Sequence, residues 1–481
     1  MKTYVVARQE SRVRIAYRMG TFVPAFLIAV QAWAGVGLCH VQTHCRAKGH
    51  NTIAASDFPY TEDIAGGTAD TPVPDPLTLS GPATSLTEIE GGCTDLGGIN
   101  LAGTQPFNAL LRAMVQVQSA TAAPGARFFV ELVVDGQPWG QFVRRLRGGL
   151  PQFDVFTATA TNLAAGGHSF SVLAALLDPG TMTVSNTYSN ALGSPATYPA
   201  VTSADPAQLT LDSAYFRPVT ETVSFANTQA VDFVVQGSFE VNSGITGQPV
   251  NLAPFLDGVR QAPVGTIAVP PYLPESVNFL SVLPAVPPGS HTLEWRAATN
   301  GQQVVFANRA IDGVAFPAST YQVLAQTTSK LTVQSLRNPM TPQPRFLDTT
   351  CGYWTRVLGG TIAADSGSYN TLYEGFVRVT GAGTGASSYG QLWFESYFPD
   401  VPTSGTDGGT RGFALAGYGD GIYIVGDTMA WAAPHAETIN LWARKVNPIC
   451  SAAGGFGTFD VGSRFIWVRH IPITPKTCFY N

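Results

Sequence analysis

The sequence predicts an all-β protein of three tandem β-sandwich modules behind an extended, partly helical N-terminal segment. Glycine and proline, at 50 and 34 of the 481 residues, interrupt the chain too often for long helices. Between these turn residues, short runs rich in Thr, Val, Phe and Tyr alternate apolar with polar positions, as half-buried strands do. Two pairs of segments also match each other at nearly the same spacing, which indicates a repeated module.

Composition limits the classes of protein to which this chain can belong. Its length exceeds one ordinary core and suggests about three units. Apolar residues make up 45% of the chain and charged residues only 12%, about half the usual share. The net charge of −5 is spread thinly, without a basic block. The chain therefore has no electrostatic footprint for nucleic acid, and we expect no nucleic-acid partner.

Residues 1–54 form the expected N-terminal anchoring segment. Residues 1–20 carry five positive side chains and one negative one, and residues 21–39 follow without a charge. This pattern fits three alternatives: a secretory signal with a small-residue cleavage site at Ala32-Trp33-Ala34, an uncleaved membrane anchor, or a helix buried in an assembly. Pro24 and Gln31 weaken the membrane-anchor alternative.

A cluster of cysteine and histidine follows the apolar run. Cys39, His40, His44 and Cys45 lie within seven residues of one another, and thiolate and imidazole groups at such a spacing could hold a structural zinc ion. The spacing contains no C-x-x-C pair of a standard zinc finger. The alternative is a small disulfide loop between Cys39 and Cys45, or a pair of thiols.

Residues 55–92 predict an extended linker, because they contain few large apolar residues and many turn formers. The repeat starts after them. Residues 128–140 match residues 250–263, and residues 162–176 match residues 285–299. These matches, with a diverged third copy, place the modules at 93–200, 205–320 and 345–481.

Each of the first two modules contains an Asp-Gly pair and a histidine at equivalent places. Asp135-Gly136 and Asp257-Gly258 lie between alternating strands and predict tight hairpins, because glycine accepts positive φ and aspartate caps its own backbone.

His168 and His291 each stand between a turn and a strand, in "GGHS" and "GSHT". The third copy has Glu437 at this position, and a catalytic base would need partners that recur with it. We therefore interpret both histidines as structural groups that hydrogen-bond the turn backbone.

The absence of common catalytic motifs argues against an enzyme. The sequence contains no G-x-S-x-G elbow, H-E-x-x-H helix, P-loop or dinucleotide fingerprint. Asp407, in the glycine-rich stretch 403–412, could contribute to a calcium site, but no second carboxylate follows at EF-hand-like spacing, so this stretch predicts a flexible loop. No cofactor is expected, with structural zinc or calcium as the alternative.

The third module is the best candidate for contact with a ligand or partner, since it is rich in aromatic residues. Exposed aromatic rings can stack on sugars or anchor a protein interface. Most of them should form the sandwich core. Trp393, Tyr397 and Trp442 are the candidates for a surface contact.

The Asp-Gly hairpin followed by a "G-x-H-T" strand resembles two kinds of protein. One is the jelly-roll-like modules of bacteriophage tail fibres, spikes and head-decoration proteins. The other is the galactose-binding-like sandwich of carbohydrate-binding modules, whose paired late strands are similar to "GSHTLEWRA" and "NRAIDGVAF". The resemblance covers about two thirds of the chain and rests on short, turn-dominated motifs.

The phage resemblance implies a non-enzymatic virion structural protein that is anchored by its N-terminus and carries its C-terminal module outward. It also implies other virion proteins as partners, a homotrimer or another symmetric homo-oligomer, and host attachment, with a cell-surface glycan as a candidate ligand. The carbohydrate-module resemblance implies instead a secreted or surface-anchored bacterial carbohydrate-binding or adhesive protein, outside the cell or on its surface.

Overall fold

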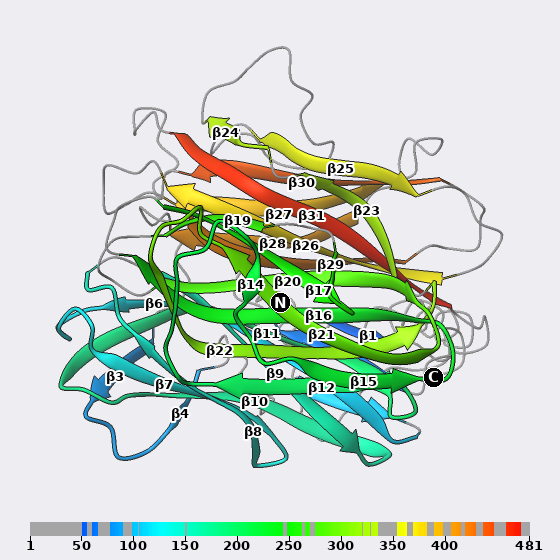
Figure 1. The fold of residues 1–481 in the computed structure, drawn as a ribbon, viewed down its shortest axis with the longest axis horizontal. Coiled ribbons are helices and arrows are strands. Elements are labelled where there is room, and N and C mark those ends of the chain that lie inside the picture. The colour runs from blue at the N-terminus through cyan, green and yellow to red at the C-terminus, as the bar shows by residue number, and fades with distance from the viewer. Residues whose placement is uncertain are drawn as a thin grey trace, which may run out of the picture.

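The fold is that of a computed structural model, and every regular element in its described part is a β-strand in an antiparallel sheet (Figure 1). The described residues are 51–54, 60–65, 77–89, 99–103, 105–149, 152–243, 248–261, 265–269, 275–319, 321–327, 329–334, 354–362, 369–381, 389–397, 406–414, 419–429, 436–446 and 458–472. The all-β prediction is confirmed. Except for residues 51–54, the N-terminal segment expected to be partly helical lies outside this part. The described residues include no helix that is long and apolar enough to span a bilayer.

Strands β1–β11 are called the first unit here, because the described strands among them share one sheet. They are β1 (Asn51–Ala54), β2 (Tyr60–Ala65), β3 (Leu77–Gly81), β4 (Thr87–Glu88), β5 (Ile99–Gly103), β6 (Phe107–Ser119), β7 (Arg127–Val134), β8 (Gln137–Arg145), β9 (Gln152–Leu163), β10 (Gly166–Leu176) and β11 (Gly180–Pro195). The sheet order is β8-β7-β10-β5-β2-β11-β6-β9. The short strands β2 and β5 therefore join the two halves of the sheet.

The described residues within 55–92 differ from the linker that the sequence predicts. Strand β2 pairs with β5 and β11, β3 pairs with β11, and β4 pairs with β10. Few large apolar side chains are needed here, since these strands are short and lie along strands that already carry the core. The first unit thus begins before residue 93.

Strands β12–β22 are called the second unit and form two sheets. They are β12 (Ala200–Asp205), β13 (Leu209–Leu211), β14 (Arg217–Pro218), β15 (Val223–Asn227), β16 (Val231–Ser243), β17 (Gln248–Leu256), β18 (Val259–Arg260), β19 (Gly265–Val269), β20 (Glu275–Val286), β21 (Gly289–Ala298) and β22 (Val304–Pro317). One sheet has the order β12-β22-β16-β20 and the other the order β14-β21-β17-β18.

Strands β23–β31 are called the third unit and also form two sheets. They are β23 (Tyr321–Thr327), β24 (Leu331–Gln334), β25 (Thr355–Ile362), β26 (Tyr369–Gly381), β27 (Tyr389–Tyr397), β28 (Thr406–Ala414), β29 (Gly419–Met429), β30 (Glu437–Val446) and β31 (Thr458–Pro472). The orders are β23-β31-β26-β29 and β25-β30-β27-β28. Strands β23 and β24 precede residue 345, the predicted start of the third module, and 406–414 is a strand rather than the predicted flexible loop.

The same connectivity occurs in all three units. The rows β11-β6-β9, β22-β16-β20 and β31-β26-β29, called the inner rows here, correspond strand for strand, as do β10-β7-β8, β21-β17-β18 and β30-β27-β28, called the outer rows. The three units lie in layers, and the inner rows face one another across the middle of the molecule (Figure 1).

Where their side chains are described, the inner rows are largely buried on both faces. Strand β16 is buried at nearly every position, although an antiparallel sheet commonly leaves one face to solvent. One face carries Phe233, Val235 and Phe239 toward the outer row of the same unit, where Phe239 packs against Trp295 of β21. The other face covers a neighbouring unit, so the sandwich core and the contact between units lie on opposite sides of one strand.

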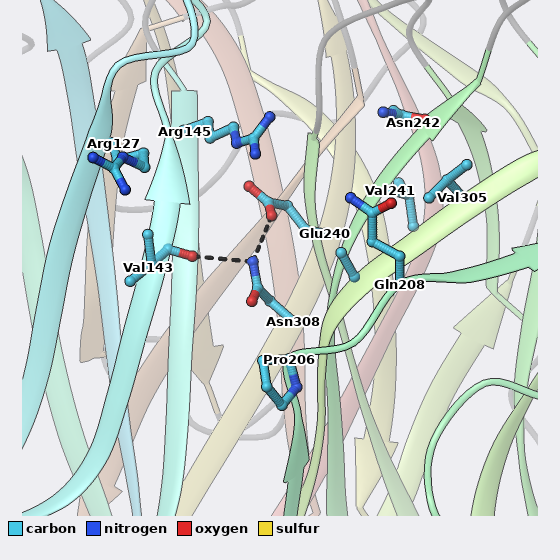
Figure 2. Close-up of a pocket in the computed structure, with 11 residues that line it drawn as sticks. Arg127, Val143, Arg145, Pro206, Gln208, Glu240, Val241, Asn242, Val305 and Asn308 are labelled. Atoms are coloured by element: carbon cyan, nitrogen blue, oxygen red, sulfur yellow. Dashed lines mark hydrogen bonds between the residues drawn. The ribbon is translucent and has the colours of Figure 1, made fainter. Parts of the chain in front are cut away.

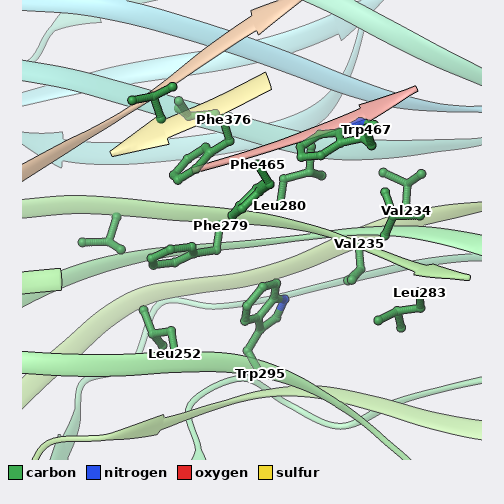
Figure 3. Packing of buried hydrophobic residues seen from close by; sticks show 14 of the residues in the cluster. Val234, Val235, Leu252, Phe279, Leu280, Leu283, Trp295, Phe376, Phe465 and Trp467 are labelled. Carbon is green, nitrogen blue, oxygen red and sulfur yellow. The ribbon is translucent and has the colours of Figure 1, made fainter. Parts of the chain in front are cut away.

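Two apolar clusters follow from this arrangement. Side chains from alternate positions of β6 form the core of the first unit, whereas Leu110 and Met114, from the other face of β6, belong to a cluster that runs through the second and third units. Between the second and third units, the ring of Phe376 lies 5.6 Å from that of Phe279 and stacks on Phe465 at 5.0 Å (Figure 3). The second and third units thus share one apolar cluster, which the first unit joins through Leu110 and Met114 while keeping a core of its own.

Candidate functional site

The Asp-Gly pairs form the hairpins that the sequence predicts, and the fold brings each pair to its module's histidine. Asp135 and Asp257 have φ of 50° and 51°, and the glycines after them have φ of 75°. Both residues of each two-residue turn therefore lie in the left-handed region, as tight hairpins require. Strand β10 pairs with β7, and β21 with β17, which places the histidines beside these turns.

Each histidine uses both ring nitrogens. His168 Nδ1 lies 2.6 Å from Asp135 Oδ2, and its Nε2 lies 2.8 Å from the carbonyl oxygen of Ala164. His291 repeats this geometry, at 2.7 Å from Asp257 Oδ2 and 2.8 Å from the carbonyl oxygen of Pro287. The sequence analysis missed the contact between histidine and aspartate.

The electrostatics favour a charged imidazolium bound to a carboxylate. Burial lowers the pKa of His291, but hydrogen bonds to Asp257 and to the Pro287 carbonyl outweigh it and raise that pKa above its ordinary value. The Asp257 pKa is lowered, first by His291 and then by the backbone N–H of Thr292. With both imidazole nitrogens occupied, neither can take a proton from a substrate, so this arrangement stabilises the turn.

Polar side chains are buried between the first and second units. Asp312, on the face of β22 that meets β9, accepts hydrogen bonds from the hydroxyl groups of Thr157 (3.0 Å), Thr159 (3.4 Å) and Thr202 (2.8 Å). It is 2% exposed, and burial raises its pKa to about 7 against the lowering effect of these hydrogen bonds. Thr159 also accepts the backbone N–H of Gly313, so the two units are tied by a directional network.

A buried arginine lies in the same interface. Arg144, 1% exposed, donates to Ser238 Oγ of the second unit and packs over the ring of Phe156. Burial raises the pKa of Asp154 and of Glu240, while Arg144 lowers both. The charge of Arg144 therefore lowers the pKa of one carboxyl group from each of the two units.

A cavity of about 230 Å³ opens beside this interface, between β8 of the first unit and β16 and β22 of the second (Figure 2). Glu240 lines it, and Glu240 Oε2 accepts a 2.6 Å hydrogen bond from Asn308 Nδ2, which also donates to the Val143 carbonyl. Arg145 and Asn242 project from the two sides (Figure 2). The sequence offers no signal for this cavity, because its walls lie about 100 residues apart along the chain.

The aromatic side chains proposed for a surface contact do not form one exposed platform. Trp442 is 2% exposed and donates its Nε1 hydrogen to Glu395 Oε2 at 3.0 Å, so its prediction as a surface contact is wrong. It packs with Trp354 on a covered face of its sheet. Tyr397 is half-buried. Trp393 is placed by its backbone alone, in β27 opposite Trp442.

The candidate zinc ligands Cys39, His40, His44 and Cys45 lie outside the described residues. Within the described part, no group of three or more His, Cys, Asp or Glu side chains is arranged to hold a metal ion. Asp407 lies in β28 opposite Glu395. Zinc and calcium therefore stay predictions.

Comparison with known proteins gives no family. No protein-family model matches this chain, and no curated protein matches it. Solved structures show distant likenesses. The CBM22-1–CBM22-2 tandem domain from Paenibacillus barcinonensis Xyn10C is 11% identical, with a TM-score of 0.19 over 56% of this chain and 91% of that one.

Two viral structures show a similar degree of likeness. The VP2 subviral particle of infectious bursal disease virus is 12% identical, with a TM-score of 0.20 over 87% of this chain and 81% of that one. An archaeal viral protein with a triple jelly-roll fold and turret assembly is 10% identical, with a TM-score of 0.18 over 83% and 89%. At these TM-scores the likenesses carry no argument about function.

Proposed function

We propose that this chain is a non-enzymatic structural protein of a bacteriophage virion: a tail or head appendage, fibre or decoration component. In this proposal, three tandem β-sandwich modules follow an N-terminal segment that anchors the chain to the assembly, and the C-terminal module is exposed. The connectivity that recurs in the three units supports the three-module division.

The observation that carries the proposal is the burial, on both faces, of the inner-row strands whose side chains are described. Phe376 and Phe465 of the third unit cover the second unit, and Thr157 of the first unit is hydrogen-bonded to Asp312 of the second. Binding modules joined by flexible linkers would leave these faces to solvent. Units whose contact faces are buried against each other move together, which suits a building block that keeps its shape.

The proposed partners are other virion proteins and further copies of this chain, in a homotrimer or another closed symmetric assembly. Two exposed apolar side chains on the second unit support a contact surface there: Tyr215 is 78% exposed and Val259 is 63% exposed. A cell-surface glycan is the proposed ligand for host attachment.

A secreted or surface-anchored carbohydrate-binding or adhesive protein is the second candidate, favoured by the uncharged run 21–39 after a basic leader. The intact mass of the native protein decides between them. A chain that begins at Met1 or Lys2 and is found in purified virions supports the virion protein. A mature start near Gly35, with the protein in the culture medium, overturns it in favour of the secreted one.

A further inference from the structure

The cavity beside the first and second units has the chemistry of a ligand site. We propose that it binds one small hydroxyl-rich ligand, a single terminal saccharide residue, through Glu240 and Arg145. This inference deepens the proposed function by giving the proposed glycan ligand a site and a size, and it does not rest on whether the chain is a virion protein or a secreted one.

Glu240 is the fixed acceptor of the site. It is 6% exposed and lines the cavity, and the carboxylate is oriented by the hydrogen bond from Asn308 to its Oε2. Asn308 is itself oriented by the carbonyl of Val143 (Figure 2). The carboxylate is therefore positioned before any ligand arrives, which reduces the ordering cost of binding.

Arg145 is the available donor. Within the described residues, no hydrogen bond or ion pair is formed by its guanidinium, and the residue is exposed. The nearby Arg127 differs, since its guanidinium is bound to Asp178 at 2.8 Å and 3.1 Å. Two cations thus line the cavity; Arg127 is held in place by its ion pair with Asp178, whereas among the described residues the Arg145 guanidinium keeps all of its donors for a ligand.

The lining selects for hydroxyl groups. Carboxylate, guanidinium and amide groups are planar and offer paired donors or acceptors, which match neighbouring hydroxyls of a sugar. Asn242 and Gln208 add two amides at the rim. Because the charges of Arg145 and Glu240 oppose each other and Asp178 neutralises Arg127, the cavity favours a neutral polar ligand over a strongly charged one.

The size of the cavity limits the ligand. Its volume of about 230 Å³ greatly exceeds the ~10–15 Å³ that one water needs and lies below the ~300–1,000 Å³ of sites for drug-sized molecules. A single sugar ring fits this range and an oligosaccharide does not. Since the walls come from two units, binding requires the packed interface between them.

The test is saturation-transfer NMR of the full chain with methyl α-D-glucopyranoside, methyl α-D-galactopyranoside and N-acetyl-D-glucosamine as the probes, followed by titration of any probe that binds. We expect at least one Kd on the order of 1 mM. Arg145→Gln should weaken that binding at least fivefold, and Glu240→Gln at least tenfold. Arg217→Gln, which removes an exposed arginine away from the cavity, should leave it unchanged.

Because Glu240 is buried beside Arg144, the folding of Glu240→Gln is checked by circular dichroism. If that variant does not fold, the test rests on Arg145→Gln, whose side chain is exposed. Absence of saturation transfer from all three probes overturns the proposal. An equal Kd for the wild type and Arg145→Gln overturns it too, because the sugar would then bind elsewhere. Neither result bears on whether the chain occurs in virions.

Discussion

Replacement of Asp312 by asparagine should remove a pH-dependent loss of folding stability at the interface between the first and second units. The carboxylate is fully enclosed by β9, β12 and β22 and accepts hydrogen bonds from three threonine hydroxyls. Asparagine has the same shape and keeps one carbonyl acceptor for these hydroxyls. The substitution therefore removes the charge while changing little of the packing.

The size of the effect follows from proton linkage. Burial raises the pKa of Asp312 from 3.8 to about 7 in the folded chain. Between these values the folded state holds a proton that the unfolded state has released, so the free energy of unfolding falls as pH rises. A difference of about three pKa units corresponds to an upper bound of about 4 kcal/mol, at about 1.4 kcal/mol per unit.

The assay is urea unfolding of the full chain at pH 5, 6, 7 and 8, with Asp212→Asn as a control at an exposed carboxylate. We expect Asp312→Asn to gain stability relative to the wild type as pH rises from 5 to 8, by up to about 3 kcal/mol, because only the part of the titration window between pH 5 and the folded pKa of about 7 falls in this range. Asp212→Asn should follow the wild type. If the midpoints of the wild type and Asp312→Asn change in parallel with pH, Asp312 does not titrate in this range and the reasoning is refuted.

Three further substitutions test other parts of the structure. His291→Ala should destabilise the chain by about 1–2 kcal/mol at pH 6 through lost hydrogen bonds. Because the folded pKa of His291 is raised, the stabilisation from the charged imidazole is complete below pH 6.5 and declines as pH rises through the folded pKa. The loss of stability in His291→Ala should therefore be smaller at pH 8 than at pH 6. Equal losses in the free energy of unfolding at the two pH values, measured by urea unfolding, would contradict this. Trp442→Phe removes the closer of two donors to Oε2 of buried Glu395, the other being Asn440, and should cost about 1 kcal/mol; an unchanged thermal midpoint would argue against that hydrogen bond. Gly237→Ala would place a Cβ 2.8 Å from atoms of Phe239 and Trp295 and should cost about 1–3 kcal/mol by overpacking. Gly149→Ala, in open space, is its control, and equal thermal midpoints for the two variants would refute the close packing.

The strands and the turns could be predicted from the sequence because they depend on local chemistry. Asp135-Gly136 predicts a hairpin wherever it lies, since the left-handed conformation is a property of the two residues. The repeated spacing, 122 residues between the aspartates and 123 between the histidines, was the signal that the two motifs belong together. The contact between His168 and Asp135 also needs the register of β10 on β7, which no short motif contains.

The aromatic candidates show why the site was harder to predict. Alternation in β27 and β30 separates two faces of a sheet, but it does not say whether a face is covered. Trp442 lies on the face opposite to Leu441 and would be exposed in an isolated sheet. Trp354 packs against it in the folded chain, and Glu395 accepts its indole hydrogen.

By itself, the sequence determined the all-β class, the strand periodicity and the turn geometry, because each depends on neighbours within a few residues. The tertiary structure decided which polar faces meet. Thr157 and Asp312 alternate with apolar residues as solvent-facing positions do, yet they bind each other across 155 positions of chain and away from water. Burial is set by what packs against a face, and for the inner rows that is another unit.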